Sequence, residues 1–416
     1  MLQKLKNNTL FQTLFELKGN PKWSICTEPL WFIPYSLFIP YQTLYMRQIG
    51  LSSFEIGTTI SVGFFLQIIF SLLGGVITDK MGRRKTTLIF DFISWTIPCL
   101  IWAGSQNFYW FLAAAAINAS FQITNTSWTC LFIEDCPPKH ITNAFTLIQL
   151  CGMLSVFFAP ISIFFIGKYD VVTVIRILYL ISAVSMSLKF IILYCFGDET
   201  QIGYQRMEET KHQSYLHLLS GYRNIFRQVI GSGKMRLVIC IMFLCNISTI
   251  ATTNFFSLYI TEKLMISAKL IAIFPMIRTL VMLLFVLLLQ NVFERLKMRL
   301  SLFIGFILYV LSHILLLSAP KESLLFIILY TLTEAAAYAI IIPRKDALMA
   351  IFVDAKERSR IYSLYHLVMI TLSTPFGSII GALYDKNPSF PFLFNIALFI
   401  FAIIFSLCTP HLKDLE

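Results

Sequence analysis

Charged residues are scarce in this chain. Only 13% of its 416 residues are Asp, Glu, Lys or Arg, and 57% are hydrophobic, whereas an ordinary soluble domain has roughly 25% charged residues. A soluble core cannot use that much apolar surface. The strict alternation of apolar and polar residues expected in an outer-membrane β-barrel is also missing. The composition therefore predicts helices that cross a lipid bilayer, which needs about 20 residues of helix.

The sequence also lacks the motifs of enzymes and of primary pumps. Neither HExxH nor GxSxG occurs, and the loops are too short to hold a catalytic domain. Residues 231–235 superficially resemble a phosphate-binding loop, but Gln228 and Met235 stand where such a loop needs Gly and Ser or Thr. The nine cysteines form no CxxC pair. We therefore expect neither an enzyme nor a cofactor, metal site or disulfide framework.

Positive charge is in excess, with a formal net charge of +11. The basic residues are spread through short loops between apolar segments, so they form no basic face for nucleic acid. Most of the 33 Lys and Arg residues fall on one side of the predicted spans, as cytoplasmic loops require. Residues 1–22 are too polar for the apolar core of a cleavable signal. We expect a multi-pass protein of the plasma membrane with both termini in the cytoplasm.

Twelve apolar segments are long enough to span a bilayer. Residues 1–23 and 412–416 are expected to be cytoplasmic tails, with a six-helix half at 24–196, a linker at 197–234 and a second half at 235–411. Helical spacing of apolar residues from Tyr215 to Phe226 predicts an amphipathic, surface-lying helix in the linker. The predicted spans are 24–47, 53–78, 87–105, 108–134, 140–167, 171–196, 235–261, 267–291, 300–319, 321–347, 358–384 and 389–410.

The two halves repeat one another. With a shift of 215 positions, residues 51–52 coincide with 266–267, Asp79 with Glu294, Pro160 with Pro375, and 169–170 with 384–385. A parallel repeat predicts pseudo-two-fold symmetry about the membrane normal. Transporters built in this way place their substrate site near mid-membrane, between the halves.

The loop between the second and third spans carries a recognisable motif. Residues 75–85 read Gly-Val-Ile-Thr-Asp-Lys-Met-Gly-Arg-Arg-Lys. This loop resembles the signature of the major facilitator superfamily, G-x-L-A-D-R-x-G-R-R/K, and the resemblance covers essentially the whole chain. It implies an all-α membrane protein of two pseudo-symmetric six-helix bundles. It also implies a secondary transporter that moves a small molecule by alternating access, and we expect the protein to be a monomer.

The chemistry of this loop suggests a gate. Gly75 permits close helix approach, Gly82 permits a tight turn, and Asp79 can cap the next turn or pair with Arg83. The resemblance implies that Arg83 also pairs with an acid at the end of the fourth span, and such contacts would lock one conformation. The alternative is that the basic cluster only fixes topology. The predicted gating residues are Gly75, Asp79, Gly82, Arg83, Arg84, Glu134 and Asp135.

Charged groups within spans are costly and need a reason. Glu334 lies about 13 residues into its span, roughly 20 Å at 1.5 Å per residue, and Arg278 lies at a similar depth. We expect an ion pair, or a coupling proton on Glu334 and an anionic substrate group on Arg278; the alternative is a static pair that only orients helices. Glu28 is expected near the cytoplasmic end, where water can reach it, and Lys189 is expected to extend towards the interface.

Polar residues on the first, fourth and seventh spans complete the predicted site, because these spans line the cavity in the resembled family. For each of them, hydrogen bonding that only holds helices together is an equal alternative. His366, on a later span, could relay protons. The predicted substrate and coupling residues are Glu334, Arg278, Glu28, Tyr35, Gln42, Asn118, Gln122, Asn125, Asn246, Thr253 and His366.

These features favour a transporter of a small organic solute, coupled to protons. Export is the direction we favour, because the gating loop is well formed. However, the fourth span has no Arg, and the region around Pro160 only partly fits the antiporter signature, so drug export is not implied. The alternatives are an uptake symporter and a non-transporting sensor on a transporter scaffold.

Overall fold

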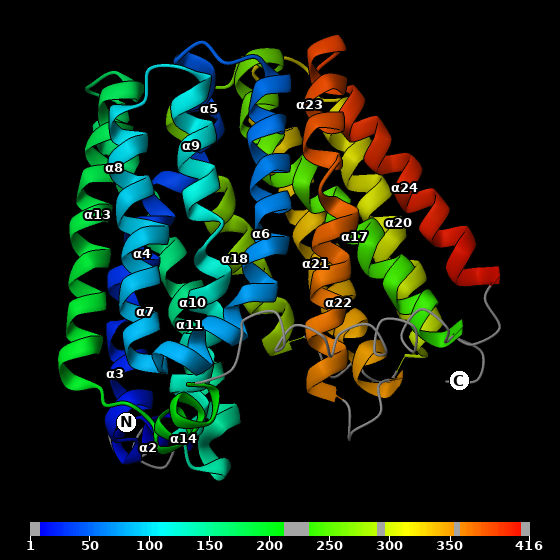
Figure 1. Cartoon of the computed structure of the whole chain (residues 1–416). Helices are drawn as coiled ribbons and strands as arrows, with labels where there is room; N and C mark the ends of the chain where they lie inside the picture. The colour runs from blue at the N-terminus through cyan, green and yellow to red at the C-terminus, as the bar shows by residue number, and fades with distance from the viewer. Residues whose placement is uncertain (1–8, 212–232, 289–295, 353–357, 409–416) are drawn as a thin grey trace. The chain divides into compact units, whose positions relative to one another are not determined.

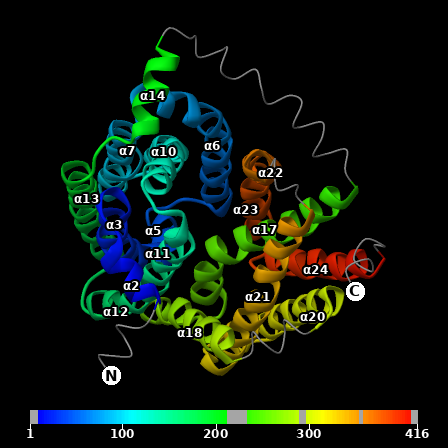
Figure 2. The ribbon, with the colours of Figure 1, turned by 90° about the horizontal axis from the view of Figure 1, so that it is seen from below.

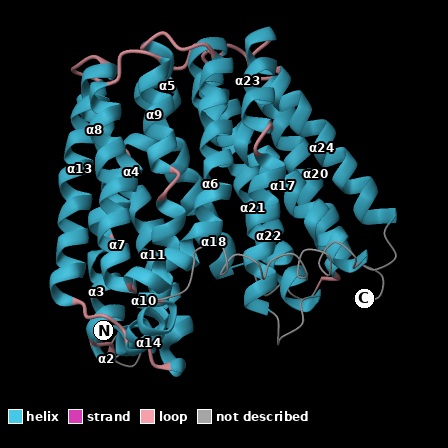
Figure 3. Cartoon of the chain, viewed as in Figure 1, coloured by secondary structure: helices cyan, strands magenta, loops and turns pink. Residues whose placement is uncertain are grey.

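The computed structural model describes residues 9–211, 233–288, 296–352 and 358–408. Every regular element in these ranges is a helix (Figure 3). The prediction of an all-α protein is therefore confirmed. The label η marks short 3-10 or π-helical turns within or between α-helices.

The elements before the linker, and at its start, follow one another in helical series. They are α2 (Thr9–Glu16), α3 (Gly19–Thr27), α4 (Pro29–Phe38), η1 (Ile39–Tyr41), α5 (Gln42–Gln48), α6 (Ser53–Met81), α7 (Arg83–Asp91), η2 (Phe92–Thr96), α8 (Ile97–Gly104), α9 (Phe108–Asn118), α10 (Phe121–Glu134), η3 (Pro138–His140), α11 (Ile141–Ser155), η4 (Val156–Phe158), α12 (Ile161–Ile166), α13 (Val171–Phe196) and α14 (Gln201–Thr210).

The elements after the linker are longer on average. They are α17 (Gly233–Leu258), η5 (Tyr259–Lys263), η6 (Ala268–Leu270), α18 (Ile273–Leu288), α20 (Met298–Leu317), α21 (Leu324–Phe352), α22 (Arg358–Ser373), α23 (Phe376–Lys386) and α24 (Phe390–Cys408). The prediction for the linker did not include α14. The amphipathic helix predicted between Tyr215 and Phe226 lies outside the described residues.

Within the described ranges, ten helical segments are long and apolar enough to cross a membrane, and they coincide with ten of the predicted spans. The other two predicted spans, 24–47 and 108–134, are built from shorter helices in series (Figure 1). In the first, Pro29, Pro34 and Pro40 lack the N–H that a continuous helix needs. In the second, α9 ends at Asn118 and α10 begins at Phe121. Breaks of this kind are tolerated in membrane proteins when neighbouring groups satisfy the freed backbone.

By its contacts the chain divides into two compact units. The first comprises Met1–Gln42 and Val62–Ser220, and the second comprises Thr43–Ser61 and Gly221–Glu416. Seen end-on, α3, α7, α10 and α13 pack together in the first unit, and α17, α20, α21 and α24 pack together in the second (Figure 2). The core of the second unit consists mainly of apolar side chains from these four helices, among them Ile241, Phe306, Ala337 and Phe399.

The segment Thr43–Ser61 belongs to the second unit because α6 packs tightly on α23. A Cβ on Gly57 would collide with the backbone of Gly377, so both helices need glycine there. The carboxylate of Asp385 caps α6, accepting hydrogen bonds from the N–H of Ser53 at 3.0 Å and of Phe54 at 2.8 Å. These contacts join an early segment of the sequence to a late one.

Candidate functional site

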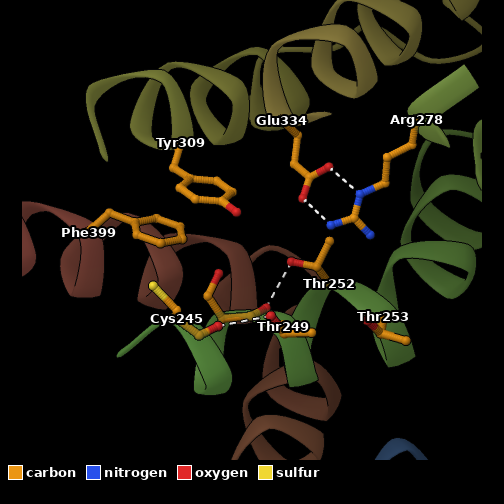
Figure 4. Close-up of a pocket in the computed structure, with 9 residues that line it drawn as sticks. Cys245, Thr249, Thr252, Thr253, Arg278, Tyr309, Glu334 and Phe399 are labelled. Atoms are coloured by element: carbon orange, nitrogen blue, oxygen red, sulfur yellow. Dashed lines mark hydrogen bonds and ion pairs between the residues drawn. The ribbon is translucent and has the colours of Figure 1, made fainter. Parts of the chain in front are cut away.

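Arg278 on α18 and Glu334 on α21 form an ion pair inside the second unit (Figure 4). The guanidinium Nη2 donates to Oε1 of Glu334 at 3.0 Å, and Nε lies 3.0 Å from Oε2. Two parallel contacts of this kind fix both position and orientation. The Glu334 side chain is 7% exposed and that of Arg278 is 30% exposed. The predicted pair therefore forms, between a buried glutamate side chain and a partly exposed arginine side chain.

The pair faces a small polar cavity. Its volume is about 10 Å³, which is room for about one water molecule. The guanidinium also lies 4.4 Å from the ring centroid of Tyr338, which favours the cation. Tyr309 stacks on Phe399 on the other side of the cavity, with ring centroids 4.5 Å apart. The lining residues are Cys245, Ser248, Thr249, Thr252, Thr253, Arg278, Tyr309, Glu334 and Phe399.

The serine and threonine hydroxyl groups in this lining come from one face of α17. Thr249 donates to the carbonyl of Cys245 and Thr252 to that of Ser248, both at 2.9 Å. A hydroxyl that donates to its own helix still presents lone pairs that can accept a hydrogen bond. The cavity thus offers one cation, one carboxylate and several acceptors to a polar occupant.

A second charged cluster lies in the first unit, and part of it corrects the sequence analysis. Lys189 on α13 donates from Nζ to Oε1 of Glu28 at 2.7 Å. Glu28 is 4% exposed and Lys189 is 7% exposed. The expectations that Glu28 is solvated and that Lys189 extends to the interface are therefore wrong. Glu28 and Lys189 pair with one another inside the bundle, so neither needs to reach water.

Asp91 completes this cluster and was missed in the sequence analysis. It is the last residue of α7 and is 5% exposed. Lys189 and Glu28 both act on it electrostatically. The sequence could have identified Asp91, because it is an isolated carboxylate within the predicted span 87–105, and a charge inside a span is costly.

Three of the predicted amide residues bond to groups in their own unit. Asn118 donates to the carbonyl of Ser94 at 2.7 Å, and Gln122 donates to Oε1 of Gln67 at 3.3 Å. Asn246 donates to the hydroxyl of Ser373 at 2.7 Å. These bonds hold neighbouring helices together, and a role in substrate binding stays a prediction.

Among the other predicted substrate residues, only Thr253 lines the cavity of the ion pair. Tyr35 on α4 stacks on Trp31, with ring centroids 4.7 Å apart. Gln42 begins α5 and is partly buried. Asn125 on α10 and His366 on α22 are exposed. Of the residues predicted on the seventh span, Thr253 lines the cavity beside Arg278.

The predicted gating loop forms the expected ion pairs. The Nε of Arg83 lies 3.2 Å from both carboxylate oxygens of Glu134, and Nη1 lies 3.1 Å from Asp79. Glu134 is thus the acid that pairs with Arg83, and Thr200 also donates a hydrogen bond to it. Asp135 instead accepts a hydrogen bond from Asn20 at 2.6 Å. Burial raises the pKa of Asp135, and the bond from Asn20 opposes that shift.

The cap of α7 comes from a residue that the sequence analysis did not propose. The carboxylate of Glu199 accepts hydrogen bonds from the N–H of Arg83 at 2.8 Å and of Arg84 at 2.9 Å. This satisfies two donors at the helix N-terminus and complements the helix dipole. Asp79 therefore pairs with Arg83 but does not cap α7. The guanidinium of Arg84 donates to the carbonyl of Tyr194 at 2.6 and 2.9 Å.

The glycines of the loop are only partly as predicted. Gly82 has φ +83°, in the left-handed region, so the predicted tight turn is confirmed. A Cβ on Gly75, however, would have no neighbour within 4 Å, so the prediction of close approach there is wrong. The close approach is made by Gly74, where a Cβ would lie 2.8 Å from the hydroxyl of Thr126 on α10.

Comparisons with known proteins agree with this architecture. The sequence model of the MFS_1 like family matches residues 30–395. No curated protein sequence matches the chain significantly.

Solved structures of similar fold include three transporters. The nucleoside transporter NupG is 12% identical, with a TM-score of 0.72 over 95% of this chain and 100% of that one. A POT family transporter in complex with a thioalcohol-conjugated peptide is 15% identical, with a TM-score of 0.71 over 95% and 98% of the chains. The human organic anion transporter MFSD10 is 15% identical, with a TM-score of 0.62 over 93% and 98%. At these identities the likeness establishes the fold, and the family match establishes that the chain belongs to the MFS_1 like family and is a transporter of the major facilitator type.

Proposed function

We propose that this chain is a secondary active transporter that moves a small organic solute with an anionic group by alternating access, coupled to protons through Glu334. The observation that carries this proposal is the ion pair between Arg278 and Glu334 beside a polar cavity. The pair supplies both a binding group for an anion and a group that can take a proton. The similar structures are named for nucleosides, a bound peptide and organic anions, which are all small organic solutes.

Competition for one guanidinium explains the coupling. Arg278 stays charged throughout, while Glu334 is either an anion bound to it or a neutral acid. An anionic substrate competes with the ionised Glu334 for the same donors. When Glu334 takes a proton, Arg278 is free to bind the substrate, and the site stays neutral overall. Proton binding and anion binding therefore favour one another.

The cooperative binding of a proton and an anion determines the direction in which a proton gradient drives transport. A proton and an anion that favour one another's binding travel together, so an inward proton gradient drives uptake. The geometry of the pair thus supports the symport alternative, whereas the prediction of export rests on the gating loop alone. We place the protein in the plasma membrane with both termini cytoplasmic, on the distribution of Lys and Arg.

The test uses the purified full-length chain. A thermal-shift screen with organic anions, at mildly acidic and mildly alkaline pH, finds a ligand, since a ligand that binds only the folded state raises Tm. The ligand is then followed into proteoliposomes with and without a proton gradient. We expect inward gradients to drive its accumulation. Accumulation driven in the opposite direction would establish export, and binding without any flux would establish a sensor.

Substitution of Glu334 tests the coupling directly. Glu334→Gln resembles the protonated acid, so we expect gradient-driven accumulation to be lost while exchange of labelled for unlabelled ligand persists. Arg278→Gln is expected to weaken binding by about tenfold or more, because a charge-assisted bidentate contact is lost. Glu322→Gln is the matched control, since Glu322 is exposed. Accumulation at the wild-type rate in Glu334→Gln would remove Glu334 from the mechanism.

A further inference from the structure

The first unit contains a charged cluster that the ion pair of the second unit does not explain. Glu28, Asp91 and Lys189 are each more than nine-tenths buried. They come from three separate parts of the fold: the junction of α3 and α4, the end of α7, and α13. Two carboxylates therefore lie near one ammonium group in the interior of a membrane-spanning bundle, and that ammonium contacts Glu28.

The charges of this cluster do not balance if both acids are ionised. The ammonium of Lys189 is committed to Glu28 at 2.7 Å and lies 5.9 Å from the ring centroid of Trp31. Among the described residues, the charged groups that act on Asp91 are Lys189 and Glu28. An uncompensated negative charge is costly in such an interior, and a carboxylate there takes up a proton instead.

In the part of the chain that the structure describes, the neighbours of Asp91 on other elements supply no second cation. On α10 the nearby group is the buried hydroxyl of Thr124. On α13, Phe190 and Leu193 are apolar. Arg84 lines the same small cavity as Asp91, but its guanidinium donates to the carbonyl of Tyr194 and lies 4.2 Å from that ring centroid. Neutrality of the cluster thus requires one proton.

The surroundings of Asp91 also suit a group that exchanges a proton. Asp91 directly precedes the π-helical turn η2, at Phe92–Thr96, and π turns inside helices occur frequently at functional sites. A cavity of about 10 Å³ joins Asp91 to Thr87, Arg84 and Tyr194, which is room for about one water molecule. That water would connect Asp91 towards the end of α7 that carries the gating loop.

We propose that Asp91 is a second proton-binding site, which shares Lys189 with Glu28 so that the three residues together hold one proton. In the described conformation Lys189 neutralises Glu28 and the proton resides on Asp91. Because lysine has a long, flexible side chain, its ammonium can move to Asp91, and the proton then moves to Glu28. This inference deepens the proposed function, since a proton-coupled transporter would use such a site, but it does not depend on Glu334.

Infrared spectroscopy of the purified full-length protein tests the proposal without any substrate. A protonated carboxylic acid has a carbonyl stretch that the carboxylate lacks, and difference spectra between a parent and a variant isolate one group. The parent carries Glu334→Gln, so that only the first unit is tested. Charge balance predicts the band of one acid in the parent at mildly acidic pH. The band is lost in Asp91→Asn and in Glu28→Gln, and it is about doubled in Lys189→Gln.

The two single carboxyl variants make the test decisive. In Glu28→Gln, Lys189 is free to pair with Asp91, so the band disappears although Asp91 is still present. Asp170→Asn, which changes an exposed cap of α13, is the matched control and is expected to keep the band. If Asp91→Asn does not fold, Glu28→Gln and Lys189→Gln still decide the question. A band of equal intensity in the parent, Glu28→Gln and Lys189→Gln would overturn the proposal, whatever the outcome of the accumulation assay.

Discussion

At the scale of single residues, exposure decides how a charge in a span behaves. Lys189 and Arg278 are both cations inside membrane helices. Lys189 is 7% exposed and the side chain of Arg278 is 30% exposed, so only Arg278 is accessible to an occupant of a cavity. The same comparison separates Glu334 from Glu322, which lies on the surface. Depth along a span therefore identifies costly charges, whereas packing decides which of them can meet a ligand.

Two adjacent glycines give a prediction at this scale. Gly74→Leu is expected to lower Tm by several degrees, because the side chain would meet Thr126 on α10, and overpacking costs about 1–3 kcal/mol. Gly75→Leu is the matched control, since a Cβ there has no neighbour within 4 Å. Thermal unfolding of both variants in detergent provides the measurement. Equal losses would show that helix propensity, and not the contact with α10, sets the requirement for glycine.

At the scale of helices, α7 is held by a carboxylate that is distant in the sequence. Glu199 lies 116 positions after Arg83 and caps the helix through two backbone N–H groups. Arg206 and Thr210 of α14 approach Asp79 in the same region. The predicted gating loop is thus tied to the start of the linker as well as to α10.

Removing this cap has a predictable cost. Glu199→Ala is expected to destabilise the protein by about 1–2 kcal/mol, since a capping carboxylate at a helix N-terminus contributes about that much. Glu208→Ala, whose side chain is 81% exposed, should change Tm by less than the error of measurement. An unchanged Tm in Glu199→Ala would mean that water replaces the cap without loss.

At the scale of the whole molecule, the proposed alternating access is expected to open and close the contact between α6 and α23, which lies within the second unit. The hydroxyls of Ser61 and Ser378 lie 3.1 Å apart at this contact. Ser61→Cys combined with Ser378→Cys, in a variant without the nine native cysteines, is expected to form a disulfide on oxidation. Flux should stop on oxidation and return on reduction, whereas each single cysteine variant should be insensitive. Undiminished flux in the cross-linked protein would show that α6 and α23 stay together throughout the cycle.

Much of this fold could be predicted from hydropathy alone, because a bilayer demands long apolar helices whatever their partners. The pairs formed by Arg278 with Glu334 and by Arg83 with Glu134 were also predictable, from depth and from the family loop respectively. The cluster around Lys189 was not, since it depends on which faces of three separate helices meet. The cap from Glu199 was missed for the same reason, and the breaks at η1 and at Ser120 depend on local backbone geometry that hydropathy does not register.

Helix α6 belongs partly to each of the two units, and it therefore links them mechanically. This helix runs unbroken over 29 residues, yet its first part, to Ser61, belongs to the second unit and the remainder to the first. The other described crossing, between Gln42 and Thr43, directly follows the 3-10 turn η1. At Gln42–Thr43 the chain thus passes between the units beside a turn, whereas at Ser61 it passes between them within a continuous α-helix. Because α6 is a continuous α-helix at Ser61, we expect its stiffness there to limit the relative motion of the two chain segments that it joins.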